Sequence, residues 1–288
     1  MFYTITGGGL TAVITDAGAQ LISLKDKSGK ELMWQPRAGF WLDISPVLFP
    51  ICGALLDGGY DYKGAHYDMS GHGFAYKRFF TLKELTDSSV TFELKSSADT
   101  KEIYPFDFTL TAAYSLANDE LSAVFTVNNE DADTLPYMFG WHPGFAIDEG
   151  EYSEYYLDYG KDAELSVHWL NGKFADPIAK PFPLTDGKWR MDTERIYCND
   201  TIILDGAKGY CALCRDGVSR KIELFWSDNI PVFCVWKWAD DNARYICLEP
   251  WTGMSNDGKT KEDFATRKME RLLPGEDEKY EYKIKITY

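Results

Sequence analysis

"KYEYKIKITY", residues 279–288, alternates polar and apolar side chains over almost its whole length. A period of two is typical of a β-strand that buries one face and exposes the other to water. The pattern recurs in short runs separated by turn residues, at 10–16, 20–26, 89–96, 108–116, 121–129, 201–205, 221–226, 232–238 and 245–248. Many short alternating runs of this kind predict a large antiparallel sandwich or barrel.

Two further segments complete the expected layout. Residues 59–69, "GYDYKGAHYDM", have the form of a β-hairpin that turns at Lys63 and Gly64. Residues 259–273, "KTKEDFATRKMERLL", are the best candidate for a helix, and that helix would be short. No repeat, low-complexity tract or linker interrupts the chain, so we expect one all-β domain over residues 1–288.

Composition and charge restrict the class of protein. The 288 residues include 30 Lys and Arg against 45 Asp and Glu, which gives a net charge of −15. An acidic surface repels phosphate backbones, so no nucleic-acid partner is expected. The first residues, "MFYTITGGGL", do not resemble a signal peptide, and no apolar run reaches the roughly 20 residues of a membrane helix. The cysteines lie mostly within apolar runs, as in a reducing compartment. We therefore expect a soluble cytoplasmic protein without a membrane partner.

Several familiar chemical motifs are absent or weak. The four histidines form no short metal-ligand spacing with each other, with cysteine or with a carboxylate, so no metal is expected. "CALC" at 211–214 has the spacing of a redox or metal pair, but no second pair accompanies it. "GGG" at 7–9 precedes no helix, and there is no nucleophile elbow. No cofactor site is predicted.

Three segments remain as candidates for chemistry. In "SGHGFAYKRFF" (70–80), His72 lies between two glycines, and a surface turn histidine is the simpler interpretation. In "GWHPGF" (140–145), Pro143 favours an extended backbone at His142, which could equally be a core or a catalytic histidine. In "RYICLEPWTG" (244–253), an apolar strand ends at Glu249, where Pro250 would stop regular pairing. Partial desolvation would raise the pKa of Glu249, although a solvated glutamate also fits the pattern.

Together these segments suggest an acid and a base in an aromatic-lined cleft. A histidine can hold or give a proton near neutral pH, and a glutamate with a raised pKa can remove one. Without a nucleophile or a metal, this combination suits proton transfer on a neutral substrate.

Four segments in this order resemble the aldose 1-epimerase (galactose mutarotase-like) family, especially its LacX-like branch and the related hexose-6-phosphate mutarotases. They are "PVLFPICGALLDGGYDYKGAHYDMSGHGFA" (46–75), "FGWHPGF" (139–145), "CNDTIILDG" (198–206) and "ICLEPWTG" (246–253). The resemblance implies a supersandwich of large antiparallel sheets. It also implies a cofactor-free isomerase that interconverts the α and β anomers of an aldose.

The resemblance also implies roles for particular residues. Glu249 would be the base on the anomeric hydroxyl, and His142 would be the acid that protonates the ring oxygen. His72 would hold the sugar near that oxygen, and Asp200 would accept hydrogen bonds from sugar hydroxyls. Other residues expected to contact the sugar are Tyr76, Trp141 and Trp251, with Phe145 as a further possible wall.

Two positions depart from the family pattern. Ala54 and Tyr76 stand where the family has arginines that contact sugar hydroxyls or a phosphate. An uncharged sugar is therefore the expected substrate, because neither residue offers the rigid fork of donors of an arginine. A hexose-6-phosphate mutarotase and a non-catalytic sugar-binding or sensing protein on the same fold are the alternatives. A carbohydrate lyase or hydrolase is disfavoured because no second carboxylate motif is recognisable.

Overall fold

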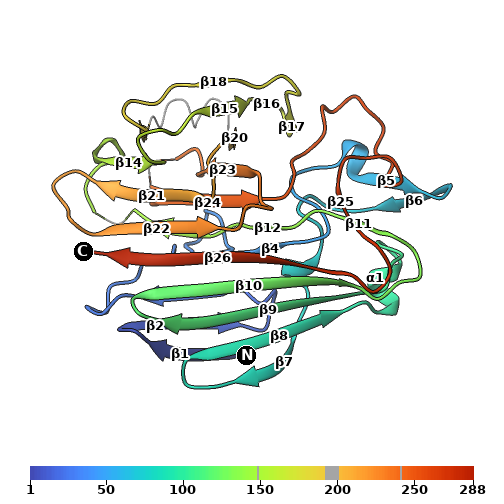
Figure 1. The fold of residues 1–288 in the computed structure, drawn as a ribbon, viewed down its shortest axis with the longest axis horizontal. Coiled ribbons are helices and arrows are strands. Elements are labelled where there is room, and N and C mark those ends of the chain that lie inside the picture. Colours follow the sequence, from blue (N-terminus) through green and yellow to red (C-terminus); the bar gives the residue numbers. More distant parts are fainter. Residues whose placement is uncertain (148, 192–200, 241) are drawn as a thin grey trace.

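The computed structural model describes residues 1–147, 149–191, 201–240 and 242–288. Its strands form two large sheets in which every neighbouring pair is antiparallel (Figure 1). The first has nine strands, in the order β19 (Lys188–Arg190), β14 (Tyr155–Asp158), β21 (Tyr210–Arg215), β22 (Lys221–Trp226), β26 (Asp277–Thr287), β10 (Glu120–Asn129), β9 (Phe108–Ala117), β8 (Ser89–Lys95) and β7 (Thr81–Leu85).

The second large sheet has eight strands and carries the candidate site. Its order is β18 (Lys180–Phe182), β15 (Leu165–His168), β20 (Thr201–Asp205), β23 (Val232–Trp236), β24 (Tyr245–Trp251), β12 (Gly140–Trp141) and β4 (Val47–Leu48), with β13 (Gly144–Ala146) also paired to β24. The predicted all-β architecture of large antiparallel sheets is confirmed.

The smaller elements lie around these sheets. One small sheet has three strands, β1 (Phe2–Gly7), β2 (Leu10–Thr15) and β3 (Leu21–Lys25). The two-stranded pairs are β5 (Gly59–Tyr62) with β6 (Ala65–Asp68), β11 (Leu135–Tyr137) with β25 (Glu270–Leu272), and β16 (Leu170–Asn171) with β17 (Phe174–Ala175). In the part of the chain that the structure describes, the helical elements are α1 (Ala98–Lys101) and short 3-10 turns at Leu56–Gly58, Ala75–Lys77 and Tyr152–Glu154. Among the described residues, no helix is long and apolar enough to cross a membrane.

The alternation at the end of the chain places β26 in the middle of the nine-stranded sheet. Tyr280, Tyr282, Ile284 and Ile286 are buried, whereas the lysines between them are exposed. Each buried side chain of this size contributes about 2 kcal/mol through loss of apolar surface to water. Tyr282 reaches across to Trp141 of the eight-stranded sheet, with ring centroids 5.5 Å apart, so the two sheets share a core.

The predicted hairpin at 59–69 is confirmed. Its strands are β5 and β6, and the turn residues Lys63 and Gly64 have φ values of 49° and 82°. Two consecutive residues with positive φ match the right-handed twist of paired strands.

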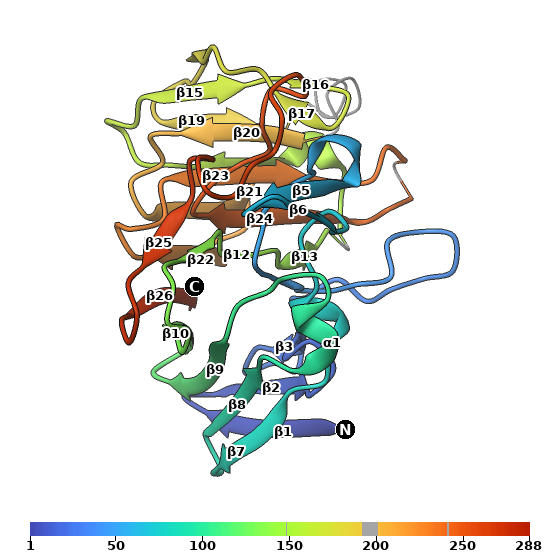
Figure 2. The ribbon, with the colours of Figure 1, turned by 90° about the vertical axis from the view of Figure 1, so that its right-hand side faces the viewer.

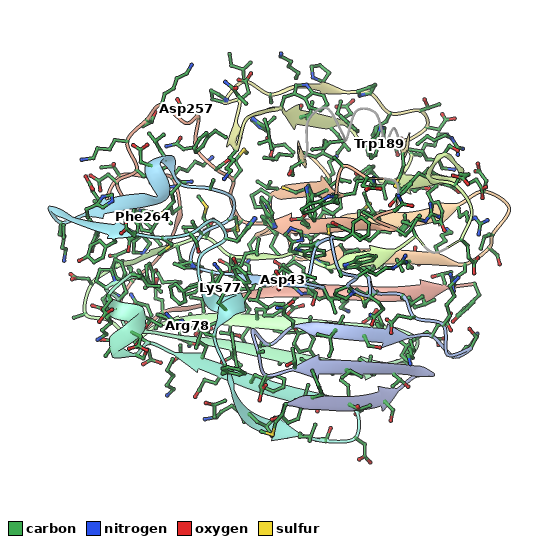
Figure 3. The ribbon with its side chains drawn as sticks, turned by 180° about the vertical axis from the view of Figure 1, so that it is seen from behind. Asp43, Lys77, Arg78, Trp189, Asp257 and Phe264 are labelled. Atoms are coloured by element: carbon green, nitrogen blue, oxygen red, sulfur yellow. The ribbon has the colours of Figure 1, made fainter. Side chains whose placement is uncertain are left out.

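The predicted helix at 259–273 is wrong. Phe264 instead lies at the hairpin (Figure 3). There it stacks on Tyr60, with ring centroids 3.6 Å apart. The backbone of Asp61 both donates to Glu262 and accepts from Phe264. These bonds to a neighbouring strand replace the bonds that a helix would make within itself, and the segment continues into β25.

Candidate active site

β24 places a glutamate in the middle of the eight-stranded sheet. Glu249 lies opposite Cys234 of β23, and it is 1% exposed. We expected the strand to end at Glu249, but it continues through Pro250 to Trp251. Pro250 lies opposite the gap between β12 and β13, where the ladder on that side is already interrupted, so its missing N–H is tolerated.

That gap holds the second residue of the site. His142 lies between β12 and β13, at a strand end as predicted, and its N–H donates to the carbonyl of Pro46. Its Nε2 lies 3.1 Å from Oε2 of Glu249. The contact is close but not aligned as a hydrogen bond. Both carboxylate oxygens therefore lack a hydrogen-bond donor among the described residues.

Burial shifts the proton affinity of this pair in opposite directions. Loss of water raises the pKa of Glu249 well above its ordinary value. Burial, and to a smaller extent the proximity of the His72 ring, lowers the pKa of His142 well below its ordinary value. The uncharged forms of both side chains are therefore favoured. Counted from a carboxylate beside a neutral imidazole, the pair holds one additional proton, and that proton lies on the carboxyl group.

His72 lies beside the pair rather than on an exposed turn. Its φ is 63°, and the Gly53 N–H donates to its Nδ1 over 3.3 Å. The ring packs edge-on against those of His142 and Trp251, with centroids 5.7 Å and 5.5 Å away. Burial, with a smaller effect of the Lys77 charge, lowers the pKa of His72 to about 4. The ring is neutral at cellular pH and keeps Nε2–H as a donor.

Two tryptophans that the motifs did not indicate enclose His142. The ring of Trp41 lies 5.0 Å from that of His142 at an angle of 32°, and Trp236 lies 5.7 Å away, nearly perpendicular. Trp41 belongs to the irregular segment between β3 and β4, which extends beyond the sheets (Figure 2). A Cβ at Gly144 would lie 2.8 Å from this indole, which explains the glycine of "GWHPGF".

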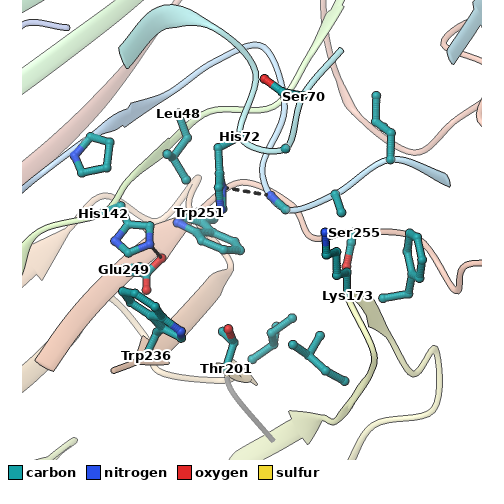
Figure 4. A pocket seen from close by; sticks show the side chains of 18 of the residues that line it. Leu48, Ser70, His72, His142, Lys173, Thr201, Trp236, Glu249, Trp251 and Ser255 are labelled. Atoms are coloured by element: carbon teal, nitrogen blue, oxygen red, sulfur yellow. Dashed lines mark hydrogen bonds and ion pairs between the residues drawn. The ribbon is translucent and has the colours of Figure 1, made fainter. Parts of the chain in front are cut away.

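These groups line a cavity of about 640 Å³ (Figure 4). His72, Tyr76, His142, Glu249 and Trp251 all line it, so the structure brings five of the predicted site residues together. Tyr76 belongs to a 3-10 turn, not to a strand. Asp200 lies outside the described residues.

The expectation that Trp141 contacts the sugar is wrong. Its side chain is fully buried and packs on Phe125 and Tyr282 between the two sheets, away from the cavity lining. The side chains of adjacent residues in a strand point to opposite faces of the sheet. Because the side chain of Trp141 points into the core between the sheets, that of His142 points to the cavity. Phe145 is also fully buried and belongs to the core.

The site contains a group of possible metal ligands that sequence spacing missed. One ligand atom each of His142, Cys247 and Glu249 lies within 4.8 Å of the others. Cys247 and Glu249 are two residues apart, so they share one face of β24. The three possible ligand atoms are a nitrogen, a sulfur and an oxygen. That the protein works without a metal therefore stays a prediction.

Comparison with known proteins places the chain in a family. The aldose 1-epimerase family model matches residues 1–285, so the chain belongs to that family. Protein LacX of Lactococcus lactis is 31% identical over 96% of both chains. An Escherichia coli protein provisionally named glucose-6-phosphate 1-epimerase is 28% identical over 63% of this chain and 58% of its own. A galactose mutarotase related enzyme of Lactobacillus acidophilus has a TM-score of 0.94 and 28% identity, over 100% of this chain and 98% of its own.

Proposed function

We propose that the protein is an aldose 1-epimerase that interconverts the α and β anomers of an uncharged sugar. The observation that carries the proposal is the buried contact of 3.1 Å between His142 and Glu249 on the wall of a large cavity. A base and an acid side by side can act on the anomeric hydroxyl and the ring oxygen, which are bonded to the same sugar carbon.

The reaction needs no net change of protons. Glu249 as carboxylate removes the proton of the anomeric hydroxyl, and His142 as imidazolium gives a proton to the ring oxygen while the bond from that oxygen to the anomeric carbon breaks. The open aldehyde turns about its adjacent carbon–carbon bond. Closure from the other face returns both protons.

The resting pair can reach this working form by one internal transfer. A neutral carboxyl beside a neutral imidazole holds as many protons as a carboxylate beside an imidazolium. Nε2 of His142 and Oε2 of Glu249 are 3.1 Å apart, so a small rotation of either side chain aligns them, and the proton can then pass from Glu249 to His142 once sugar hydroxyls stabilise the charges. Burial favours the neutral form until the sugar binds.

Neighbouring side chains would hold the sugar in place. The neutral His72 can donate its Nε2–H to a sugar oxygen, and Trp251 offers an indole face. Ala54 leaves space at a position where the family resemblance implies an arginine, and Tyr76 can hydrogen-bond through its hydroxyl.

An anomer-exchange NMR screen of free and phosphorylated aldoses tests the proposal. We expect exchange that accelerates in proportion to protein concentration for at least one free aldose. Binding of sugars without any exchange would instead favour a sugar-binding or sensing protein on the same fold.

The pH profile should be bell-shaped, because the pair works only with one proton. A second proton at low pH removes the base, and loss of the last proton at high pH removes the acid. Burial lowers the pKa of His142 below its ordinary 6.5, so the acid limb of kcat/KM should fall below pH 6.5. An acid limb at or above that value, measured over a full pH range, would contradict this reading.

Uncharged hexoses should bind better than their 6-phosphates. Among the described lining residues, Lys173 is the one lysine or arginine. Arg78, expected on the same face as Tyr76 if the segment were a strand, instead lies with Lys77 at a separate depression (Figure 3). Titration of a free hexose and its 6-phosphate at equal salt checks this. Tighter binding of the phosphate, lost in Lys173→Ala or Arg78→Ala, would show that a cation replaces the missing arginines.

Trp41→Ala should lower kcat by about tenfold, because the His142 ring loses a packing partner and becomes accessible to water. Water would also raise the pKa of His142, so the acid limb should move to higher pH. Trp41→Phe should restore both properties in part. Leu42→Ala, at a neighbouring residue that is 71% exposed, serves as the control. A change in KM alone would assign Trp41 to sugar contact.

A further inference from the structure

The cavity is larger than one sugar ring requires. Its volume of about 640 Å³ lies within the range of roughly 300–1,000 Å³ typical of sites for drug-sized ligands. A monosaccharide has about half as many atoms as a disaccharide. Figure 4 shows Lys173 and Ser255 across the cavity from His142 and Glu249, with Trp251 between. We call the end formed by Lys173, Phe174 and Ser255 the distal end.

The distal end is held in place by specific contacts. Ser255 is 5% exposed, and its Oγ accepts the N–H of Ala175, which ties it to the β16–β17 hairpin. A Cβ at Gly258 would lie 2.5 Å from the ring of Phe174. This ring therefore packs tightly on the loop that follows β24. The hydroxyl of Ser255 can still donate a hydrogen bond. The end therefore offers an aromatic ring with two donors, Ser255 and Lys173.

We propose that the distal end is a second sugar subsite, and that the preferred substrate is a reducing sugar carrying another uncharged sugar on its 4-hydroxyl. This inference rests on the proposed function, since it assumes that the anomeric carbon lies at His142 and Glu249. In a pyranose ring the 4-hydroxyl lies opposite the anomeric carbon. A substituent there points straight away from the acid and base, along the cavity past Trp251.

The chemistry of the distal end fits a neutral sugar better than a phosphate. A phosphate is usually bound by arginine forks or by several backbone N–H groups, whereas the distal end has a single exposed lysine. An aromatic ring beside hydroxyl and ammonium donors suits a ring that has apolar faces and a polar rim. The net charge of −15 gives no long-range attraction to an anion.

Anomer-exchange kinetics with paired sugars test the subsite. We expect kcat/KM for cellobiose or lactose, which are 1,4-linked, to exceed that for glucose by about tenfold or more. Sophorose, which is 1,2-linked, should show no such advantage because its second ring points sideways. Lys173→Ala and Phe174→Ala should each lower the ratio of cellobiose to glucose by about tenfold.

Controls separate this inference from its alternatives. Lys173 is exposed, so its truncation leaves the core intact, and thermal unfolding checks the Phe174 variant. Lys180→Ala, at an exposed lysine of β18 outside the cavity lining, should leave the ratio unchanged. Equal or better kcat/KM for glucose, equal rates with sophorose, or unchanged ratios in both variants would overturn the subsite.

Failure of the proposed function would look different. If no aldose exchanges, calorimetric titration of cellobiose and glucose still tests the subsite. Tighter binding of cellobiose that depends on Phe174 supports it, whereas equal binding overturns it. A loss of hexose 6-phosphate binding alone in Lys173→Ala would also overturn it, because the distal end would then be an anion site.

Discussion

Glu249→Gln is expected to slow anomer exchange by at least roughly 10²-fold, with sugar binding largely kept. Glutamine preserves the shape of the side chain but cannot accept the proton of the anomeric hydroxyl. Exchange NMR measures the rate, and calorimetry measures binding. Glu270→Gln is the matched control, because Glu270 is a partly buried glutamate whose pKa burial also raises, but it lies on β25 outside the cavity lining. Near-normal exchange in the Glu249 variant would assign the base to another group.

The same substitution should not destabilise the fold. Glu249 is 1% exposed, and no described donor compensates its carboxylate oxygens. Burial raises the pKa of Glu249, so the folded protein must take up a proton there at neutral pH; a neutral amide removes that cost, and the melting temperature should stay equal or rise. A large fall in melting temperature together with lost activity would mean that the substitution disrupts the fold, and the lost activity would then say nothing about the base.

His142→Gln has the second largest expected effect. The ring oxygen loses its acid, so exchange should slow by roughly 10²-fold or more. His168→Gln is the matched control, since both histidines are 8% exposed and His168 bonds to Asp205 on β20, away from the cavity lining. An equal loss of activity in both variants would indicate general damage to the fold. A loss confined to the His142 variant, with sugar binding kept, supports the acid role.

Alternation predicts the strands of this protein well because burial of one face enforces it. In β26 the buried tyrosines and isoleucines occupy every second position. Residues 259–273 failed as a helix because part of their backbone bonds to the distant hairpin and another part pairs with β11, and no local pattern reveals such partners. Tertiary contacts overrode the local preference there.

The sequence predicts those residues of the site that belong to short motifs, and it does not predict the others. The motifs gave Glu249 and His142, which the structure brings into contact. They misplaced Trp141, because the sequence does not show on which face of a two-residue strand a ring lies. They also missed Trp41, which lies in an irregular segment about 100 residues before its partner. Gly144 was the one local hint of that close approach.

The anomer-exchange rate of the double variant Glu249→Gln, His142→Gln tests most directly whether Glu249 and His142 act together as the acid and base. If the two side chains act as one proton-sharing unit, the double variant should lose about as much rate as the more damaged single variant, because either change alone already stops the unit. Losses that multiply would show that the two residues act independently. Exchange that persists in the double variant would contradict the assignment of catalysis to this pair.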